Sequence, residues 1–352
     1  MAIRHGIVAS AVALPPTVSL SAASNFNQEI ATLNATVDAN GYSTTVKFQY
    51  STASNFSSYT EVNAATTPIT GQAVSSYANI TGLSVNTTYY FRCVATNDIG
   101  TTTSSSLSFT TWNIQVYERT TSGGTTFTIP TVTPTGGSAV AVSIYDIIMF
   151  GAGGGGGTGG GGGGGGYQNV ASRSMTGSRS ITTSVGAAGT YDSSTGSGFA
   201  GGNTTLTGDL TSLTANGGGG ANASTGTAGA SGNGNSGGSN VGYDDGNVKT
   251  IDNFGYGGGG GAGGVGANGS ANSTNGYGGN GGVGVSITSG GVTRAGGAGG
   301  GGAGYLGLSQ GVNGSRGSNN TYGSGGNSSY GGGGNGQDGY IRFRYYAASA
   351  LA

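Results

Sequence analysis

Ile147-Ile-Met-Phe-Gly-Ala-Gly-Gly-Gly-Gly-Gly157 is the stretch where the character of the chain changes, and a second glycine run, Gly159–Gly166, follows after Thr158. Residues 1–150 contain 9 of the 81 glycines, whereas residues 151–352 contain the other 72, all before Tyr340. Ordinary proteins contain about 7% glycine. The sequence therefore divides near Phe150 into a conventional part and a glycine-rich part.

The remaining composition excludes several classes of protein. Charged residues make up 7% of the 352 residues, against a usual ~25%, and the net charge is -1. Because nucleic-acid binding depends on clustered Lys and Arg, we expect no nucleic-acid partner. The longest apolar stretch, residues 139–150, is shorter than the ~20 residues of a membrane helix, so we expect no membrane insertion. A lone cysteine, Cys93, excludes a disulfide framework within the chain.

Residues 15–112 show the alternation of apolar and polar residues that is typical of β-strands. Short runs rich in Val, Thr, Tyr and Phe are separated by turn residues such as Asn40-Gly41. About seven strands in about 100 residues favour a two-sheet β-sandwich. The alternation predicts a common core formed by six residues: Leu33, Val37, Phe48, Tyr89, Phe91 and Leu107. Cys93 also falls on the inward side, which favours a core role over a reactive thiol.

This first part resembles the fibronectin type III family. The resemblance rests on Ala31–Gly41, Val46–Tyr50 and Ile80–Asn97, and it covers roughly residues 15–111. It implies that Tyr89, six residues after Leu83, forms a tyrosine corner in which its hydroxyl bonds to the backbone. Such domains mostly act as spacers or docking units, so the resemblance indicates a fold and no chemistry.

Strands are predicted on both sides of the glycine-rich part. Residues 113–150 continue the alternation and lead into the first glycine run. Residues 338–346 form another alternating stretch that we expect to pair with them. We therefore expect five segments: an N-terminal anchoring tail (1–14), the fibronectin-like domain (15–112), the launching strands (113–150), the glycine-rich domain (151–340), and a closing strand with a C-terminal tail (341–352).

The glycine-rich domain is predicted to be ordered rather than disordered. Glycine loses much backbone entropy on folding, but scattered Tyr, Phe, Leu and Val interrupt the runs. The regular structure that suits packed glycine is a polyproline-II-type helix with three residues per turn, here called a polyglycine-II rod. Rods that lie side by side can bond through backbone N–H and C=O groups, because no side chain separates them. The predicted fold class is all-β, with a sandwich followed by polyglycine-II rods.

Residues from Phe127 onward resemble the glycine-rich domain of bacteriophage tail fibres and adhesins. The resemblance rests on Thr126–Pro130, Gly201–Thr205, Ala215–Gly220, Gly258–Gly264 and the closing Gly-Tyr-Ile-Arg strand. It implies a virion surface protein that contacts a host cell.

No motif for catalysis or cofactor binding stands out. Gly-x-Gly-x-x-Gly arises by chance in so glycine-rich a stretch, and neither Lys47 nor Lys249 ends a phosphate-binding loop. His5 is the sole histidine, which makes a catalytic triad or a multi-histidine metal site improbable. A single Gly-Gly-x-Gly-x-Asp match at residues 333–338 lacks the tandem repeats that bind calcium. We expect no enzyme, no cofactor and no metal.

Tyrosines beside glycine are the candidate binding residues. Tyr among Ser, Asn and Gly is typical of recognition loops, and aromatic faces also suit sugars. The alternative is that these tyrosines cap the ends of the rods and shield them from water. We predict that exposed tyrosines outnumber buried ones at the end of the rods far from the fibronectin-like domain. The candidates lie where a rod must reverse: Tyr256, Tyr277, Tyr305, Tyr322 and Tyr330.

The functional expectation is a non-enzymatic bacteriophage virion protein, a tail fibre or receptor-binding adhesin. Its partners would be other virion proteins through the N-terminal region and a host cell-surface polysaccharide or protein, with a homo-oligomer left open. One alternative is a capsid decoration protein, or head fibre. A more distant alternative is an extracellular ice- or polysaccharide-binding protein, although the irregular glycine spacing argues against an ice-binding face.

Overall fold

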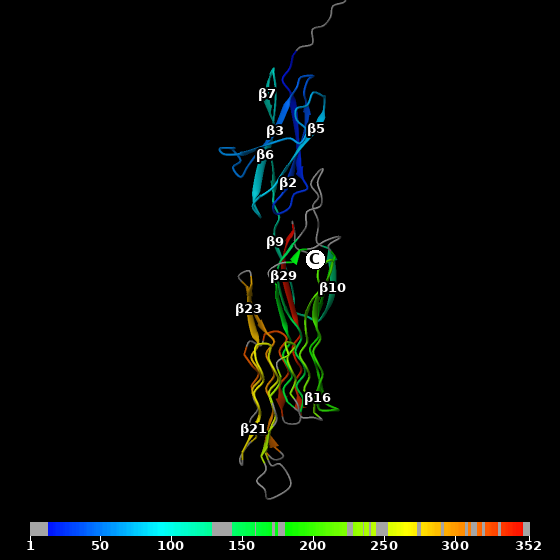
Figure 1. The fold of residues 1–352 in the computed structure, drawn as a ribbon, viewed down its shortest axis with the longest axis vertical. Coiled ribbons are helices and arrows are strands. Elements are labelled where there is room, and N and C mark those ends of the chain that lie inside the picture. Colours follow the sequence, from blue (N-terminus) through cyan, green and yellow to red (C-terminus); the bar gives the residue numbers. More distant parts are fainter. Residues whose placement is uncertain are drawn as a thin grey trace, which may run out of the picture. The chain divides into compact units, whose positions relative to one another are not determined.

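The computed structural model is all-β (Figure 1), and its described residues contain no helix. They fall into two compact units, which we call unit 1 (residues up to Ile114) and unit 2 (from Gln115 to Tyr345). Most of the predicted N-terminal tail lies outside the described residues. The structure describes residues 13–128, 143–158, 160–170, 173–174, 180–223, 228–234, 236–238, 241–243, 253–272, 276–289, 292–306, 309–310, 315–318, 321–329 and 332–347.

Unit 1 consists of two antiparallel sheets. In the first, the order is β1 (Thr17–Ser24), β2 (Ala31–Asp38) and β5 (Val74–Ile80). In the second, β4 (Thr60–Asn63), β3 (Thr45–Ser51), β6 (Thr88–Asn97) and β7 (Gly100–Thr103) follow one another, and β8 (Leu107–Thr110) also pairs with β6.

The inward residues of both sheets form one apolar cluster. Leu33, Val37, Phe48 and Phe91 are fully buried and Tyr89 is 8% exposed, which confirms five of the six predicted core residues. Leu107 was wrongly predicted to be buried, and it is 38% exposed. It occupies the first position of the short strand β8, and Phe109 fills the core from that strand instead.

Cys93 lies in the interior of unit 1, as predicted. Its side chain is fully buried, and desolvation raises the pKa of the thiol to about 12. Burial disfavours the charged thiolate, so the group stays neutral at physiological pH and packs as a small apolar residue.

The Tyr89 hydroxyl makes the backbone contact that the fibronectin resemblance implies. It accepts a hydrogen bond from the backbone N–H of Ser84 at 3.0 Å. The Tyr89 ring also stacks on Phe109, with the ring centroids 5.8 Å apart. The hydroxyl thus ties the segment before β6 to the core.

Replacing Tyr89 by phenylalanine is expected to lower the free energy of unfolding of unit 1 by about 1 kcal/mol, because one hydrogen bond is lost while the ring stays in place. Urea unfolding followed by the fluorescence of Trp112, the only tryptophan and 8% exposed, measures the change. Tyr90→Phe is the control, since that hydroxyl has no hydrogen bond within the described residues. Equal effects of the two substitutions would contradict a specific role for the Tyr89 hydroxyl.

Unit 2 begins with two sheets that bracket the glycine-rich part. One has the order β12 (Tyr167–Val170), β11 (Ser143–Phe150), β29 (Tyr340–Ala347) and β9 (Asn113–Arg119), with β13 (Arg173–Ser174) also on β11. The other has the order β10 (Gly123–Thr128), β14 (Ser180–Val185), β17 (Thr204–Gly208) and β18 (Leu213–Ala215). The pairing of β11 with β29 confirms that the closing strand joins the launching strands.

The remaining strands of unit 2 are short hairpins and one small sheet. The sheet has the order β19 (Val241–Tyr243), β20 (Asn253–Gly255), β25 (Gly304–Leu306) and β26 (Ser309–Gln310). The hairpins pair β15 (Tyr191–Asp192) with β16 (Ser197–Gly198), β21 (Ser270–Ala271) with β22 (Gly276–Tyr277), β23 (Val285–Ser289) with β24 (Val292–Gly296), and β27 (Ser328–Ser329) with β28 (Gly332–Gly333).

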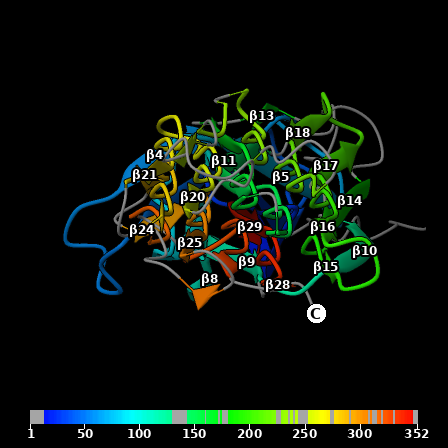
Figure 2. The same ribbon diagram turned by 90° about the horizontal axis from the view of Figure 1, so that it is seen from below.

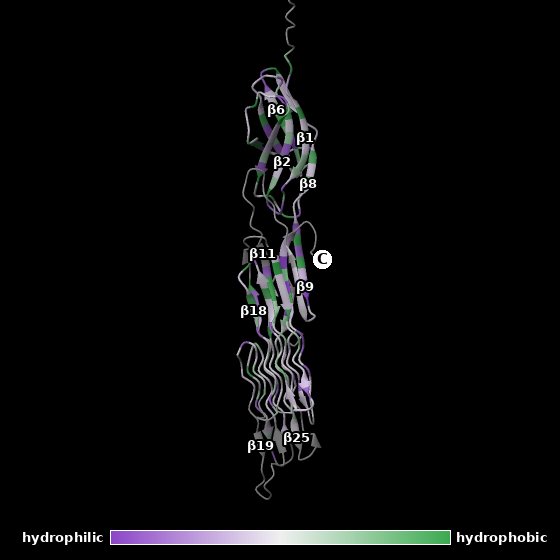
Figure 3. Ribbon diagram, turned by 90° about the vertical axis from the view of Figure 1, so that its right-hand side faces the viewer, coloured by the Kyte–Doolittle hydropathy of each residue, from purple (hydrophilic) through white to green (hydrophobic). Residues whose placement is uncertain are grey.

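Extended glycine segments run between these strands, and we call them together the glycine array. Figure 3 shows them as pale ribbons of neutral hydropathy that continue from the more strongly coloured strands such as β9, β11 and β18. Figure 2 looks nearly along them and shows β11 and β29 between the β14–β17 side and the β20–β25 side. The segments are residues 151–157, 160–166, 186–190, 198–202, 216–221, 229–232, 257–264, 279–284, 297–303, 323–327 and 334–339.

In the first segment, residues 151–157, each successive backbone N–H donates to a different neighbouring segment. The same neighbouring segment recurs at every third residue. The N–H groups donate in order as follows: Gly151 to Gly166, Ala152 to Gly202, Gly153 to Gln337, Gly154 to Gly163, Gly155 to Phe199, and Gly156 to Gly334. A β-strand alternates with period two and pairs with two neighbours. The period of three therefore sets these segments apart from a β-sheet.

The carbonyl groups of the same segment bond to further neighbours. Ala152 and Gly155 accept from Gly218 and Ala221, and Gly154 accepts from Gly326. Every residue from Gly151 to Gly157 is buried, as are all of Gly160–Gly166. The two central segments are thus enclosed, and their polar backbone groups are satisfied by the segments around them rather than by water.

Glycine is required in the centre because the backbones touch. A Cβ added to Gly163 would overlap the backbone of Ala230, and one added to Gly154 would overlap Gly219. These contacts involve backbone atoms, which cannot rotate away as a flexible side chain can. In segments at the edge of the array, burial recurs every third residue, as at Ala215, Gly218 and Ala221.

Candidate functional site

The glycine segments end in two different kinds of structure, which we call the sheet end and the hairpin end. The sheet end carries β11, β29 and the strands next to them. The hairpin end carries the hairpins β15–β16, β21–β22 and β27–β28 and the small sheet β19–β20–β25–β26. Figure 1 shows β16 and β21 at this end and β10 and β29 at the other.

Three of the five predicted binding tyrosines lie at the hairpin end. Tyr256 directly follows β20, Tyr277 ends β22, and Tyr305 lies in β25. Tyr191 and Tyr243 lie there too, in β15 and β19, although they were not among the candidates. Both also border glycine-containing stretches, so the signal that selected the others applies equally to them. Tyr330 lies outside the described residues.

Tyr322 lies at the sheet end instead. Its ring stacks on Tyr340 with centroids 4.3 Å apart, and it also faces Phe150 at 6.4 Å. It is half-buried against the cluster that contains Ile148 and Ile287. The prediction that Tyr322 marks an exposed reversal is corrected accordingly, because an apolar cluster lies at this point and covers the ring.

The described tyrosines of the hairpin end are half-buried rather than exposed. This holds for Tyr191, Tyr256 and Tyr277. The Tyr191 ring lies against Gly332 and Gly333, and burial raises the pKa of the Tyr256 hydroxyl. The expected excess of exposed tyrosines is therefore not found among these three side chains. All three side chains keep part of their surface open to solvent.

Asparagine side chains hold the periphery of the array. Asn335 accepts a hydrogen bond from the N–H of Tyr191 at 2.9 Å, Asn327 accepts from Gly301 at 2.9 Å, and Asn280 accepts from Ser315 at 2.9 Å. These amide oxygens satisfy backbone donors where the regular pattern of the segments ends. The frequent Asn beside Gly thus has a structural cause, and it fixes the hairpins relative to the segments.

The β15–β16 hairpin has an ordered, exposed turn. Asp192 accepts hydrogen bonds from the Ser194 hydroxyl (2.7 Å), the Thr195 hydroxyl (2.8 Å) and the Ser194 backbone (2.8 Å). The side-chain bonds from Ser194 and then Thr195 lower the pKa of Asp192 to about 2. The carboxylate is consequently ionised at any ordinary pH, and its bonds hold the turn in one shape.

A polar cluster at the sheet end was not predicted from the sequence. Arg294 donates to both carboxylate oxygens of Glu118 through one nitrogen, at 2.9 and 3.1 Å, and to the Tyr340 hydroxyl at 2.8 Å. The Tyr340 hydroxyl in turn donates to Glu118 at 3.0 Å, and burial raises the pKa of this hydroxyl well above its usual value. The cluster joins β9, β24 and β29, so its role is to connect strands.

Among the described residues, the groups at the hairpin end comprise phenol, amide and hydroxyl groups and the carboxylate of Asp192. Such groups can stack on a ligand and form hydrogen bonds with it. Within the described part of the chain, no three His, Cys, Asp or Glu side chains come together as metal ligands. The described residues also hold no helix long and apolar enough to cross a membrane.

The fold and this surface define an all-β protein with a glycine-rich domain. Residues 119–346 match the family model of the glycine-rich domain, which is more than half of the chain. The chain belongs to this family. No curated protein sequence matches it.

Two solved structures share limited similarity. Both are of the sensor domain of the anti-sigma factor RsgI4 in Pseudobacteroides cellulosolvens, one of them a shorter form of that domain. They are 20% and 22% identical and cover 27% and 28% of this chain and 74% and 97% of their own, each with a TM-score of 0.23. Similarity at this level supports no conclusion about function.

Proposed function

We propose that the chain is a non-enzymatic bacteriophage virion protein, a tail fibre or receptor-binding adhesin, and that the hairpin end of its glycine array contacts the host surface. The resemblance to the glycine-rich domain of phage tail fibres and adhesins supports this proposal, and the family membership agrees with its glycine-rich part alone. The N-terminal region would attach it to other virion proteins, and its location would be the virion surface. The host ligand would be a cell-surface polysaccharide or protein.

We further infer that unit 1 is a fibronectin type III-like sandwich that acts as a spacer. The order of its sheets, β1-β2-β5 and β4-β3-β6-β7, supports this inference, because non-adjacent strands pair as in that family of sandwiches. The Tyr89–Ser84 hydrogen bond at the predicted corner also supports it.

The glycine array is best explained as a bundle of polyglycine-II rods. A helix with three residues per turn directs successive N–H groups about 120° apart, so each rod bonds to three neighbours as a donor. The donor series from Gly151 to Gly156 has this period. Some neighbours run parallel, as where Gly161 and Gly164 donate to Gly257 and Gly260, and others run antiparallel, as where Gly162 and Gly165 donate to Gly326 and Gly323.

The functional proposal rests on one observation: backbone hydrogen bonds from the glycine array hold the hairpin end in place. Tyr256 donates its N–H to Ala303 at 2.8 Å and accepts from Gly279 at 2.9 Å, so its backbone is held between two segments. A rigid base lowers the entropic cost of presenting loops to a ligand. Half-buried tyrosine rings among serine and asparagine then offer stacking faces and hydrogen bonds in fixed positions.

Replacing both Tyr256 and Tyr277 by alanine is expected to reduce adsorption of virus particles to their host cells at least ~10-fold, because ~1.4 kcal/mol of lost contact suffices for that change. Adsorption is measured with particles that carry the variant protein and the strain that the unmodified particles infect. Ser270→Arg is a second variant, since Ser270 is exposed on β21, opposite Tyr277 on β22, and a long side chain there obstructs the surface without removing a ring.

Tyr77→Ala in unit 1 is the matched control, because Tyr77 is also half-buried but lies outside unit 2. It is expected to leave adsorption unchanged. If particles with the hairpin-end variants assemble fully and adsorb normally, the adhesin proposal is contradicted. That result would favour a capsid decoration protein, in which the N-terminal region binds the shell and the glycine array only projects.

A further inference from the structure

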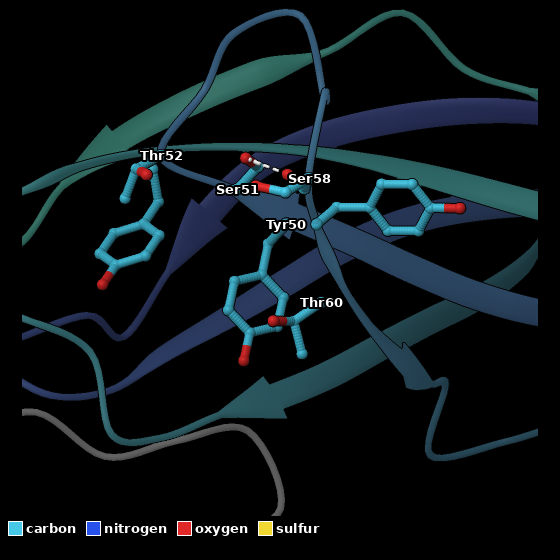
Figure 4. A pocket seen from close by; sticks show the side chains of 7 residues that line it. Tyr50, Ser51, Thr52, Ser58 and Thr60 are labelled. Atoms are coloured by element: carbon cyan, nitrogen blue, oxygen red, sulfur yellow. Dashed lines mark hydrogen bonds between the residues drawn. The ribbon is translucent and has the colours of Figure 1, made fainter.

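A cleft in unit 1, far in sequence from the glycine array, has the features of a ligand site (Figure 4). Its volume is about 290 Å³. The cleft lies where β3 ends, β4 begins and β6 begins. It is lined by seven residues: Tyr50, Ser51, Thr52, Ser58, Tyr59, Thr60 and Tyr89.

The lining combines aromatic rings with neutral hydroxyl groups. The Tyr50 and Tyr89 rings are tilted at 57°, with centroids 6.3 Å apart, and Tyr59 is 50% exposed. Figure 4 shows the hydroxyl of Thr60 beside the Tyr50 ring. None of the seven lining residues carries a carboxylate or an amine, so the cleft offers stacking faces and hydrogen bonds without a charge.

The segment between β3 and β4, residues 52–59, is held in one conformation by its own hydrogen bonds. The Ser51 hydroxyl donates to the Ser58 carbonyl at 2.6 Å and accepts from the N–H of Ala53 at 2.9 Å. The first of these bonds is drawn in Figure 4. The N–H of Phe56 donates to the Ala53 carbonyl at 3.0 Å. The cleft is therefore closed on one side by a loop that needs little further ordering on binding.

Backbone strain in this loop is a second observation. Phe56 has a φ of 53°, a left-handed conformation that is rare for a bulky residue. The ring is 8% exposed and lies under the Arg92 guanidinium, whose carbon is 4.3 Å from the ring centroid. Arg92 also donates to Gln49 at 2.8 Å. Strain that packing maintains in this way is concentrated at binding and catalytic sites.

We propose that this cleft binds a neutral saccharide of one or two rings. The C–H face of a sugar ring packs on an aromatic ring, here the exposed Tyr59 and the half-buried Tyr50, and the sugar hydroxyls bond to Ser and Thr hydroxyls. The volume lies at the lower end of ligand pockets, roughly 300–1,000 Å³, which fits a small occupant. The seven lining residues include no cation. The Arg92 guanidinium, whose carbon is 5.7 Å from the Tyr59 ring centroid, already lies over Phe56 and bonds to Gln49.

This site is independent of the function proposed for the hairpin end, since it belongs to the other unit. Purified full-length protein labelled with ¹⁵N is titrated with glucose, galactose, N-acetylglucosamine, maltose, cellobiose and lactose. At least one sugar is expected to cause saturable shifts of the backbone amides of Ser51, Tyr59 and Thr60. Glucuronic acid, which is anionic, is expected to cause smaller shifts at equal concentration.

Tyr59→Ala is expected to weaken binding of the same sugar at least ~10-fold, equivalent to ~1.4 kcal/mol. Tyr59 is exposed, so its loss leaves the core intact. Thr60→Arg, also at an exposed position, fills the cleft and is expected to have the same effect. Tyr42→Ala, a tyrosine outside the cleft, is the control and leaves the affinity unchanged.

Two results would overturn the proposal. One is the absence of saturable shifts at the cleft with all six sugars. The other is binding that Tyr59→Ala and Thr60→Arg do not weaken.

A proline-rich peptide is titrated in parallel, because aromatic grooves also bind extended peptides. Shifts at the cleft with the peptide but with none of the sugars would contradict the saccharide proposal and indicate a peptide ligand. The hairpin-end variants Tyr256→Ala and Tyr277→Ala serve to separate the two sites, since they leave these shifts unchanged.

Discussion

Gly163→Ala is expected to lower the free energy of unfolding of unit 2 by about 3 kcal/mol or more, at or above the upper end of the usual range for overpacking. Gly163 is fully enclosed, and its new methyl group would overlap the backbone carbonyl of Ala230. Separating the two segments to make room would also break the hydrogen bonds from Gly229 to Gly161, at 2.8 Å, and from Gly232 to Gly164, at 2.9 Å. Urea unfolding followed by circular dichroism measures the loss, and Trp112 fluorescence shows whether unit 1 is unaffected.

Gly334→Ala is the matched control for this prediction. Gly334 also belongs to a glycine segment and donates to Asn327, but an added Cβ would meet no atom closer than 3.4 Å. Its effect is expected to be below about 1 kcal/mol, since alanine loses less backbone entropy than glycine on folding. If Gly163→Ala lowered the free energy of unfolding no more than Gly334→Ala, the segments of Gly163 and Ala230 could not be in backbone contact.

Asp146→Asn is expected to lower the free energy of unfolding of unit 2 by about 3–5 kcal/mol. Asp146 accepts from Arg344 at 2.6 Å and from Arg342 at 3.4 Å, and the side chains of Asp146 and Arg342 are each 3% exposed. Removing the carboxylate charge takes away the anion that both arginines contact in the sheet of β11 and β29. Burial makes this effect nearly independent of salt concentration.

Glu61→Gln serves as the control for the buried charges. Glu61 pairs with Lys47 at 2.7 Å, but both side chains are more than a third exposed. An exposed ion pair contributes at most about 1 kcal/mol and weakens in salt. An Asp146→Asn variant that lost no more stability than Glu61→Gln, with the same salt dependence, would show that water reaches the two arginines.

The strands that bracket the glycine-rich part could be predicted because apolar runs and alternating stretches adjoin the glycine segments on both sides. Both faces of these strands are buried: Ile147, Ile148, Met149 and Phe150 are fully enclosed, and so are Tyr340, Ile341 and Phe343. The alternation therefore predicted the strands but does not determine their pairing register, because a register is specified by pattern only where one face is exposed. The same reasoning placed Phe48 and Phe91 correctly in unit 1 but failed for Leu107, because alternation does not show where a facing sheet ends.

The arrangement of the glycine segments could not be predicted from the sequence. Composition indicated three residues per turn, but a bare glycine backbone carries no side-chain pattern that identifies its partner. Nothing in residues 151–157 distinguishes residues 196–202 from residues 334–337 as a neighbour. The partners are determined by what lies at the ends of the segments, such as Asn335 beside Tyr191.

The candidate binding residues were predicted only in part, for a related reason. Every candidate tyrosine lies in or beside a glycine-rich stretch, and this does not tell a ring at a hairpin from one in a core. Tyr322 stacks on Tyr340, a contact made across residues that only the folded array brings together. The residues next to each tyrosine therefore indicate that it lies at the end of a glycine segment. They do not indicate whether that end is the sheet end or the hairpin end.

The arrangement of the glycine array is tested most directly by NMR scalar couplings across backbone hydrogen bonds in the ¹⁵N,¹³C-labelled protein. Three consecutive amides are expected to couple to carbonyls of three different segments: Gly154 to Gly163, Gly155 to Phe199, and Gly156 to Gly334. Gly157 should again couple to the segment that contains Gly163, because its N–H donates to Gly160. Couplings from Gly154 and Gly156 to one and the same segment, with the period of two of a β-strand, would contradict an array of rods with three residues per turn.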